Sequence, residues 1–218
     1  MHLDLELLAE ALGSRPVAWS PVGTGGYTRS LAWRVESADG VAFAKQAEDE
    51  GSLHMLRREA LVYRKVIGPF LPDLVGFADS GDRALLAIEL LESAHWPPPY
   101  PDDVGPLFEA LDLVAATEPP SDLPVHGTRE SRWARVAAEP EPFLGLGLCS
   151  RGWFASSVDA LVAAERRADF VGGHLVHNDV YSANVAFTGR GAVLVDWGAA
   201  VRGSRWIDVA FALLSVRA

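Results

Sequence analysis

The stretch that decides the fold is His177-Asn178-Asp179-Val180-Tyr181-Ser182-Ala183-Asn184, followed by Val193-Leu194-Val195-Asp196-Trp197-Gly198. Each part begins after or within a short apolar run typical of a β-strand. Two carboxylates, Asp179 and Asp196, and one carboxamide, Asn184, therefore lie at predicted strand ends. Such hard oxygen donors suit Mg²⁺, and an oriented carboxylate can accept a hydroxyl proton. The pattern therefore indicates phosphoryl transfer, which needs little more from a protein.

Upstream of this stretch, the first 92 residues read as strand, strand, strand, helix, strand. Residues 18–22 form the first predicted strand, 31–35 alternates with period two, and a turn precedes the third strand at 41–45. The apolar run 84–91 has the character of a buried strand. The pattern predicts an antiparallel sheet.

Two further features lie between these strands. Gly23, Gly25 and Gly26 separate the first two strands, where the missing Cβ atoms allow backbone amides to approach phosphate oxygens. From Glu50 to Ile67 the apolar residues recur at steps of three and four, which predicts an amphipathic helix.

The composition changes at the prolines of residues 96–101, and we place a boundary between two lobes near residue 92. Residues 139–147, with two prolines and two glycines, read as a loop. Beyond the boundary the apolar spacing predicts three helices, over 104–116, 129–138 and 158–171.

The composition excludes several classes of protein. The chain has 218 residues, a net charge of -10 and one cysteine, Cys149. Its acidity opposes binding to nucleic acid, and no apolar run reaches the roughly 20 residues that span a membrane. The first residues lack the basic and apolar parts of a secretory signal. We expect a cytoplasmic protein whose charge favours a cationic small molecule.

With its motifs in this order, the sequence resembles the aminoglycoside phosphotransferase and choline kinase branch of the protein-kinase-like superfamily. The resemblance implies a two-lobed α+β fold. Its N-terminal lobe, residues 1–92, has an antiparallel sheet and one helix, and its C-terminal lobe, residues 93–218, is mainly helical. The implied reaction transfers the γ-phosphoryl group of ATP, with Mg²⁺, to a hydroxyl group of a small molecule.

The resemblance also implies a role for each matching residue. Asp179 would accept the hydroxyl proton, and Asn184 and Asp196 would hold Mg²⁺ between the phosphates. Lys45, at the end of the third predicted strand, would contact the α- and β-phosphates. Glu59, on the predicted helix, would be its ion-pair partner.

Other parts of the nucleotide site follow from the same resemblance. Gly23, Gly25 and Gly26 would form the phosphate loop, and the segment from Glu89 to Leu91 would be the hinge whose backbone binds adenine. His177 would keep the catalytic loop in shape. Asp208 resembles the aspartate that tethers the following helix to that loop.

Several departures separate the chain from protein kinases. Thr28 stands where protein kinases have a third glycine, and Trp197 replaces the phenylalanine that usually follows the metal-binding aspartate. Asn178 stands where an arginine would serve a phosphorylated loop. Only nine residues separate Gly198 from Asp208, so the long activation segment that supports a protein substrate is missing. A small-molecule acceptor is therefore favoured.

The acceptor site is expected mainly in the insertion of residues 93–156. Its acids could face a cationic acceptor such as an aminoglycoside, and its aromatic residues could stack on a ring or fill the core. The acids are Asp102, Asp103, Glu130, Glu139 and Glu141, and the aromatic residues are Trp96, Tyr100, Trp133 and Trp153.

Alternatives remain open at this point. The chain ends ten residues after Asp208, earlier than in the family it resembles, so it is either a compact variant or lacks a C-terminal piece. A metabolic kinase of choline, ethanolamine, a sugar or homoserine fits the same motifs. A nucleotide-binding pseudokinase is the alternative without catalysis.

Overall fold

The computed structural model describes residues 3–23, 30–96, 101–127, 132–168 and 170–215. Within these ranges the chain forms an α+β fold, with an antiparallel sheet in its first part and mostly helices in its second. The predicted fold class is confirmed. No helix in the described ranges is long and apolar enough to cross a membrane.

The sheet has five strands in the order β1-β2-β3-β5-β4, and every neighbouring pair is antiparallel. Lys45 lies opposite Ala32 on one side and Leu86 on the other, so it belongs to the central strand. The strands are β1 (Pro16–Pro21), β2 (Ser30–Ser37), β3 (Gly40–Ala47), β4 (Leu74–Asp79) and β5 (Ala84–Glu89).

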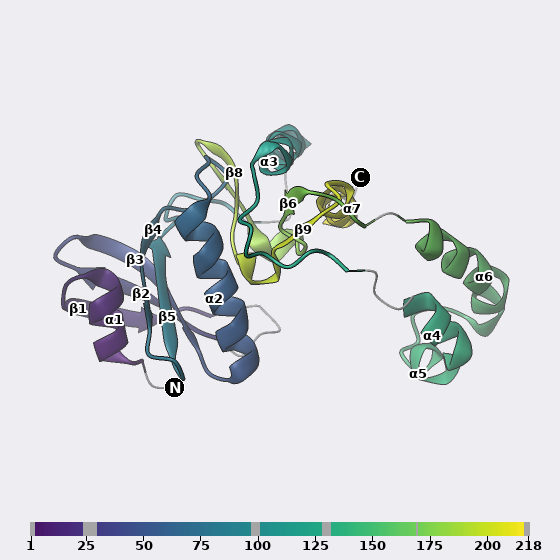
Figure 1. Cartoon of the computed structure of the whole chain (residues 1–218), viewed down its shortest axis with the longest axis horizontal. Helices are drawn as coiled ribbons and strands as arrows, with labels where there is room; N and C mark the ends of the chain where they lie inside the picture. The colour runs from purple at the N-terminus through teal and green to yellow at the C-terminus, as the bar shows by residue number, and fades with distance from the viewer. Residues whose placement is uncertain (1–2, 24–29, 97–100, 128–131, 169, 216–218) are drawn as a thin grey trace.

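Helices cover both faces of this sheet, α1 (Leu5–Leu12) on one and α2 (Glu50–Lys65) on the other (Figure 1). Successive side chains of a strand point to opposite faces of the sheet, so β5 can contact a helix on each face. Leu85 packs in the cluster that contains α1, whereas Leu86 packs in the cluster that contains α2. A Cβ atom on Gly76 would lie 1.9 Å from a carbonyl oxygen of α1, so glycine permits this close approach.

Helix α2 begins and ends at clear local signals. The Asp49 carboxylate accepts a hydrogen bond from the Ser52 amide at 2.7 Å, and the Ser52 hydroxyl oxygen accepts one from the Asp49 amide at 3.0 Å, which forms a capping box. The helix ends at Lys65 rather than Ile67, because the backbone of Val66 is extended, with φ -106° and ψ 134°. Ile67 is 94% exposed, so the prediction that it belongs to the buried stripe is wrong.

The second part of the chain packs directly against α2. One hydrophobic cluster includes Leu56 of α2, Leu107 of α3 (Val104–Ala116), Leu194 and Trp197, so it joins both parts of the molecule. A Cβ atom on Gly198 would lie 3.0 Å from the side chain of Met55 on α2, so the chain after Trp197 touches this helix closely. The other elements here are η1 (Pro101–Asp103), β6 (His174–Val176), η2 (Ser182–Asn184), β7 (Val185–Thr188), β8 (Gly191–Leu194), η3 (Trp197–Ala199), β9 (Val201–Gly203) and α7 (Trp206–Ser215).

Three helices, α4 (Arg132–Ala138), α5 (Pro140–Leu144) and α6 (Arg151–Arg167), form a separate unit at the end of the molecule far from the sheet (Figure 1). The ring of Phe143 packs between those of Trp133 and Phe154, with centroid distances of 5.4 and 5.9 Å. Glu165 accepts hydrogen bonds from the first two amides of α4, both at 2.8 Å. The unit is therefore held by its own contacts.

Two predictions for this unit are wrong. The segment predicted as a loop over 139–147 contains α5, because a proline is tolerated in the first turn of a helix, where its missing amide would have no partner. Helix α6 begins at Arg151 rather than near Val158, since Ser150 caps it by accepting a hydrogen bond from the Trp153 amide at 3.1 Å.

Candidate active site

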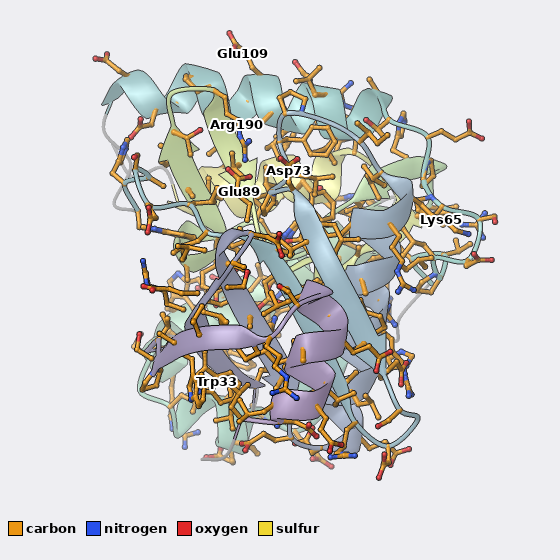
Figure 2. All side chains as sticks on the ribbon, turned by 90° about the vertical axis from the view of Figure 1, so that its left-hand side faces the viewer. Trp33, Lys65, Asp73, Glu89, Glu109 and Arg190 are labelled. Carbon is orange, nitrogen blue, oxygen red and sulfur yellow. The ribbon has the colours of Figure 1, made fainter. Side chains whose placement is uncertain are left out.

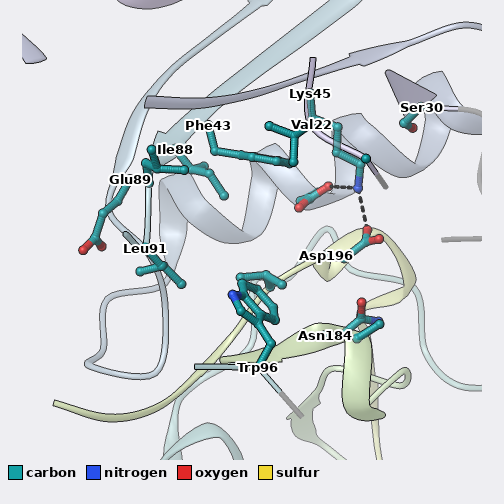
Figure 3. A pocket seen from close by; sticks show the side chains of 15 residues that line it. Val22, Ser30, Phe43, Lys45, Ile88, Glu89, Leu91, Trp96, Asn184 and Asp196 are labelled. Carbon is teal, nitrogen blue, oxygen red and sulfur yellow. Dashed lines mark hydrogen bonds and ion pairs between the residues drawn. The ribbon is translucent and has the colours of Figure 1, made fainter. Parts of the chain in front are cut away.

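A cavity of about 450 Å³ lies where the sheet meets the second part of the chain. Figure 3 shows apolar side chains at one end and charged side chains at the other. Its lining comes from the sheet, from α2, from the linker after β5 and from the segments around η2 and β8. The lining residues are Val22, Gly23, Ser30, Phe43, Lys45, Glu59, Ile88, Glu89, Leu90, Leu91, Trp96, Ala183, Asn184, Val195 and Asp196.

Two ion pairs meet at Lys45 at the charged end of the cavity. Its ammonium nitrogen lies 3.0 Å from Glu59 Oε2 and 2.7 Å from Asp196 Oδ1 (Figure 3). These residues come from β3, α2 and the turn after β8, which are distant in the sequence. The fold therefore brings together one cation and two carboxylates that the sequence analysis had selected separately.

Burial and the two ion pairs shift the pKa values of Lys45 and Glu59. Burial disfavours the charged ammonium, but the carboxylates of Glu59 and Asp196 outweigh it, and the pKa of Lys45 is raised. Burial also raises the pKa of Glu59 to about 7, although Lys45 opposes the shift. The Glu59 side chain is only 3% exposed, so its charge depends on its partner.

The segment predicted to be the catalytic loop brings Asp179 against Asn184. The Asn184 side-chain amide donates hydrogen bonds to Asp179 Oδ2 and to its backbone carbonyl, both at 3.0 Å. Burial, and then the negative charge of Asp196, raise the pKa of Asp179. Since the Asn184 nitrogen is engaged with Asp179, its amide oxygen is the atom of that side chain suited to a cation. Asn184 lines the cavity, whereas Asp179 is not among the lining residues and is linked to it through Asn184.

Asp208 on α7 holds the backbone at the start of this segment. Asp208 is 3% exposed and accepts hydrogen bonds from the amides of His177 and Asn178, both at 2.8 Å. Burial raises the pKa of Asp208 to about 6 against the opposing effect of these two bonds. Asn178 has a φ of 65°, a left-handed conformation that Asn tolerates better than most residues. The carboxylate therefore fixes an unfavourable backbone turn just before Asp179.

Trp197 and His177 pack together and hold the backbone on either side of Asp196. Their rings meet edge to face with centroids 4.5 Å apart, and the Trp197 indole donates to the Leu194 carbonyl at 2.9 Å. His177 Nε2 donates to the Val195 carbonyl at 2.9 Å, and burial lowers the pKa of His177 to about 4, so the ring is neutral at pH 7. Asp196 itself has a φ of 63°. Packing thus holds its strained backbone, and with it the carboxylate that meets Lys45.

The nucleotide-site predictions are only partly covered by the structure. Gly23 and Leu91 line the cavity, as Figure 3 shows for Leu91. Gly25 and Gly26 lie outside the described residues.

Glu89 also lines the cavity, and its side chain makes contacts that the sequence did not predict. Its carboxylate points away from the cavity to Arg190, at 2.5 Å, and accepts a hydrogen bond from the Asp73 amide at 3.1 Å (Figures 2 and 3). The Glu89 amide donates to the Asp73 carbonyl at 2.8 Å. Glu89 therefore ties the end of β5 to the turn between β7 and β8.

The acids of the insertion do not gather at the cavity. Among the described residues of 93–156, Trp96 is the one that lines it. Asp103 pairs with His95 at 2.8 Å, and Glu141 pairs with Arg151 at 2.6 Å. Glu130 lies outside the described residues. The electrostatic argument for a cationic acceptor thus gains no support from the described acids of this segment.

A comparison of the sequence with protein families gives one clear result. The profile of the phosphotransferase enzyme family (APH) matches residues 24–218, which is most of the chain. The chain belongs to this phosphotransferase family. A search of curated proteins found no significant match to its sequence.

Solved structures with the same fold include several phosphotransferases. A thermostable form of the aminoglycoside phosphotransferase APH(4)-Ia has a TM-score of 0.62 and 18% identity, covering 95% of this chain and 75% of that one. The spectinomycin phosphotransferase APH(9)-Ia, solved with ADP and spectinomycin, has a TM-score of 0.68 and 14% identity, covering 95% of this chain and 71% of that one.

A third similar structure is a candidate fructosamine-3-kinase from Haemophilus somnus. It has a TM-score of 0.56 and 15% identity, covering 95% of this chain and 75% of that one. At these identities the likeness shows the fold of this phosphotransferase. The prediction that the chain is shorter than its relatives is also confirmed, since it spans about three quarters of each of these structures.

Proposed function

We propose that this phosphotransferase moves the γ-phosphoryl group of ATP to a hydroxyl group of a small molecule. The observation that carries the proposal is the position of Lys45 between Glu59 and Asp196 at one end of a cavity of about 450 Å³. A cavity of this volume falls in the range that accommodates a cofactor or a drug-sized ligand. An ammonium group held by two carboxylates can contact phosphate oxygens without moving far.

Mg²⁺ fits the residues at the same end of the cavity. Asp196 supplies a carboxylate and Asn184 a carboxamide oxygen, and both line the cavity. Within the described ranges no group of three or more His, Cys, Asp or Glu side chains could hold a metal by itself. This agrees with Mg²⁺, which is usually bound by one or two protein ligands together with substrate phosphates and water. When bound, Mg²⁺ would neutralise charge on the phosphates.

Asp179 is the proposed proton acceptor. Its carboxylate accepts a hydrogen bond at 3.0 Å from Asn184, a residue that lines the cavity. In the proposed step the acceptor hydroxyl oxygen attacks the γ-phosphorus, its proton passes to Asp179, and ADP leaves. The raised pKa of Asp179 brings the carboxylate closer in basicity to a working general base.

The acceptor we propose first is a hydroxylated antibiotic of the aminoglycoside type. Structures of the same fold include APH(4)-Ia in complex with AMP-PNP and hygromycin B, and APH(9)-Ia in complex with ADP and spectinomycin. The net charge of -10 favours a cationic acceptor over an anionic one.

A kinase of a small metabolite is the second candidate. The similar structure of a candidate fructosamine-3-kinase favours an amino-sugar acceptor. Its cationic and hydroxyl groups would satisfy the same site chemistry as an aminoglycoside.

A screen of acceptors by ADP release tests the proposal. The purified chain is incubated with ATP and Mg²⁺ and with hygromycin B, spectinomycin, a fructosamine or choline in separate reactions. We expect at least one acceptor to raise ADP release well above the rate without acceptor. ATP binding with no acceptor-dependent release across a broad panel of hydroxyl compounds would contradict a catalytic role and favour the nucleotide-binding alternative.

A further inference from the structure

Trp96 is a large aromatic residue that lines the cavity without a role in the reaction proposed above. It comes from the linker after β5, and 45% of its surface is exposed. Figure 3 shows the indole between Leu91 and Asn184, on the opposite side of the cavity from Phe43. A flat aromatic face is thus presented to the cavity between its apolar end and its charged end.

The backbone just before Trp96 is fixed by a pairing with β7. The His95 amide donates to the Phe187 carbonyl at 3.0 Å, and the Phe187 amide donates to the His95 carbonyl at 2.9 Å. The two rings are stacked, with centroids 5.1 Å apart and planes 20° from parallel. His95 Nε2 also lies 2.8 Å from a carboxylate oxygen of Asp103, which is buried. These contacts place Trp96 before any ligand arrives, so a ligand that stacks on it loses little entropy in ordering it.

The position of the indole indicates which part of the nucleotide donor it would contact. Lys45 and Asp196 mark the phosphate end of the cavity under the proposed function, and Ile88 and Leu91 line the apolar end. A nucleotide whose phosphates lie at the first end extends its base toward the second, past Trp96.

We propose that Trp96 stacks on the base of the nucleotide and gives the enzyme a preference for purine over pyrimidine donors. This inference rests on the proposed function. Stacking strength grows with the overlapped ring area, and a purine offers two fused rings where a pyrimidine offers one. Stacking depends little on ring substituents, so Trp96 separates ATP from CTP and leaves ATP and GTP similar.

The test compares binding of three probes to four forms of the whole chain. Calorimetry measures the Kd values of ATP, CTP and inorganic tripolyphosphate, each with Mg²⁺, for the unaltered protein and for Trp96→Leu, Trp96→Phe and Trp153→Leu. Trp153 is the matched control, because it is 48% exposed on α6 and does not line the cavity. Tripolyphosphate has the phosphates without a base, so it reports on the charged end alone.

We expect Trp96→Leu to weaken ATP binding about ten-fold, in the range measured for single base-stacking contacts. CTP binding should weaken less than three-fold, so the preference for the purine narrows, and tripolyphosphate should change less than two-fold. Trp96→Phe should keep most of the affinity for ATP. Trp153→Leu should leave all three Kd values unchanged.

Three results would overturn the inference. One is an unchanged Kd for ATP in Trp96→Leu, and another is an equal loss for ATP and tripolyphosphate, which would indicate general damage to the site. The third is a higher KM for the acceptor with unaltered ATP binding, which would assign Trp96 to the acceptor instead. Failure of the unaltered protein to bind ATP at all is distinguishable, because it would contradict the proposed function itself.

Discussion

Replacing Lys45 with methionine tests how strongly the buried Glu59 carboxylate depends on its ammonium partner. The methionine side chain has a similar length but no charge, so Glu59 loses the ion pair at 3.0 Å and keeps its buried position. Breaking a buried pair from one side leaves an uncompensated charge, which a carboxyl group relieves by binding a proton. In the variant we therefore expect Glu59 to stay protonated in the folded protein well above pH 7.

The size of the effect follows from the two pKa values. In the unaltered protein the pKa of Glu59 is raised from 4.5 to about 7, so above pH 7 the group is ionised in both the folded and the unfolded state. Its contribution to the free energy of unfolding is then constant. In Lys45→Met the folded protein keeps a proton that the unfolded chain releases, so stability falls by about 1.4 kcal/mol per pH unit as the pH rises. Between pH 7 and 9 the variant should lose about 3 kcal/mol relative to the unaltered protein.

Urea unfolding followed by circular dichroism at pH 6, 7, 8 and 9 measures this difference. The double variant Lys45→Met with Glu59→Gln is the control, because its neutral amide cannot ionise and its stability deficit should not depend on pH. A deficit of Lys45→Met that is equal at pH 7 and pH 9 would refute the reasoning, since it would show that Glu59 reaches solvent when its partner is removed.

Four further substitutions test the packing of the fold. Gly76→Ala places a Cβ atom 1.9 Å from a carbonyl oxygen of α1 and should destabilise the protein by about 3 kcal/mol. Its control is Gly105→Ala, where nothing lies within 4 Å of the new Cβ atom, and which should stabilise the protein by up to about 1 kcal/mol. Equal unfolding midpoints for the two variants would contradict the packing of α1 on β4. Trp197→Phe should cost about 2 kcal/mol in urea unfolding, because it leaves a cavity and an unpaired carbonyl. Arg190→Ala should change stability by less than about 1 kcal/mol, because its ion pair with Glu89 is about one third exposed; a larger loss in thermal unfolding would show that this link is a main support of the end of β5.

Much of the candidate site could be predicted because its residues carry local signals. Asp179 and Asp196 follow short apolar runs, so their places just after strands can be inferred from neighbouring residues, and Asn184 was selected by its spacing from Asp179. Lys45 and Glu59 were selected from their order along the chain and from a family resemblance. Their mutual contact is a tertiary fact, and the structure places both beside Asp196. Their catalytic roles stay predictions until activity is measured.

The parts that were missed depend on contacts between distant segments. The Glu89 side chain turns to Arg190, which lies 101 residues further along the chain, and no local pattern indicates that pair. The direction of Trp96 follows from the pairing of its neighbour His95 with Phe187. Helix α1 and strand β4 were also not predicted. Gly76 within β4 weakens the local strand signal, and its meaning becomes clear only when α1 lies against it.

The most direct test of the central claim is the rate of acceptor-dependent ADP release by Asp179→Asn, with an acceptor found in the screen. Asparagine keeps the shape of the side chain and can still accept the bond from Asn184, but it cannot take the hydroxyl proton. The account predicts a fall in kcat of at least about 100-fold with the Kd of ATP nearly unchanged. A kcat within a few-fold of the unaltered protein would contradict it.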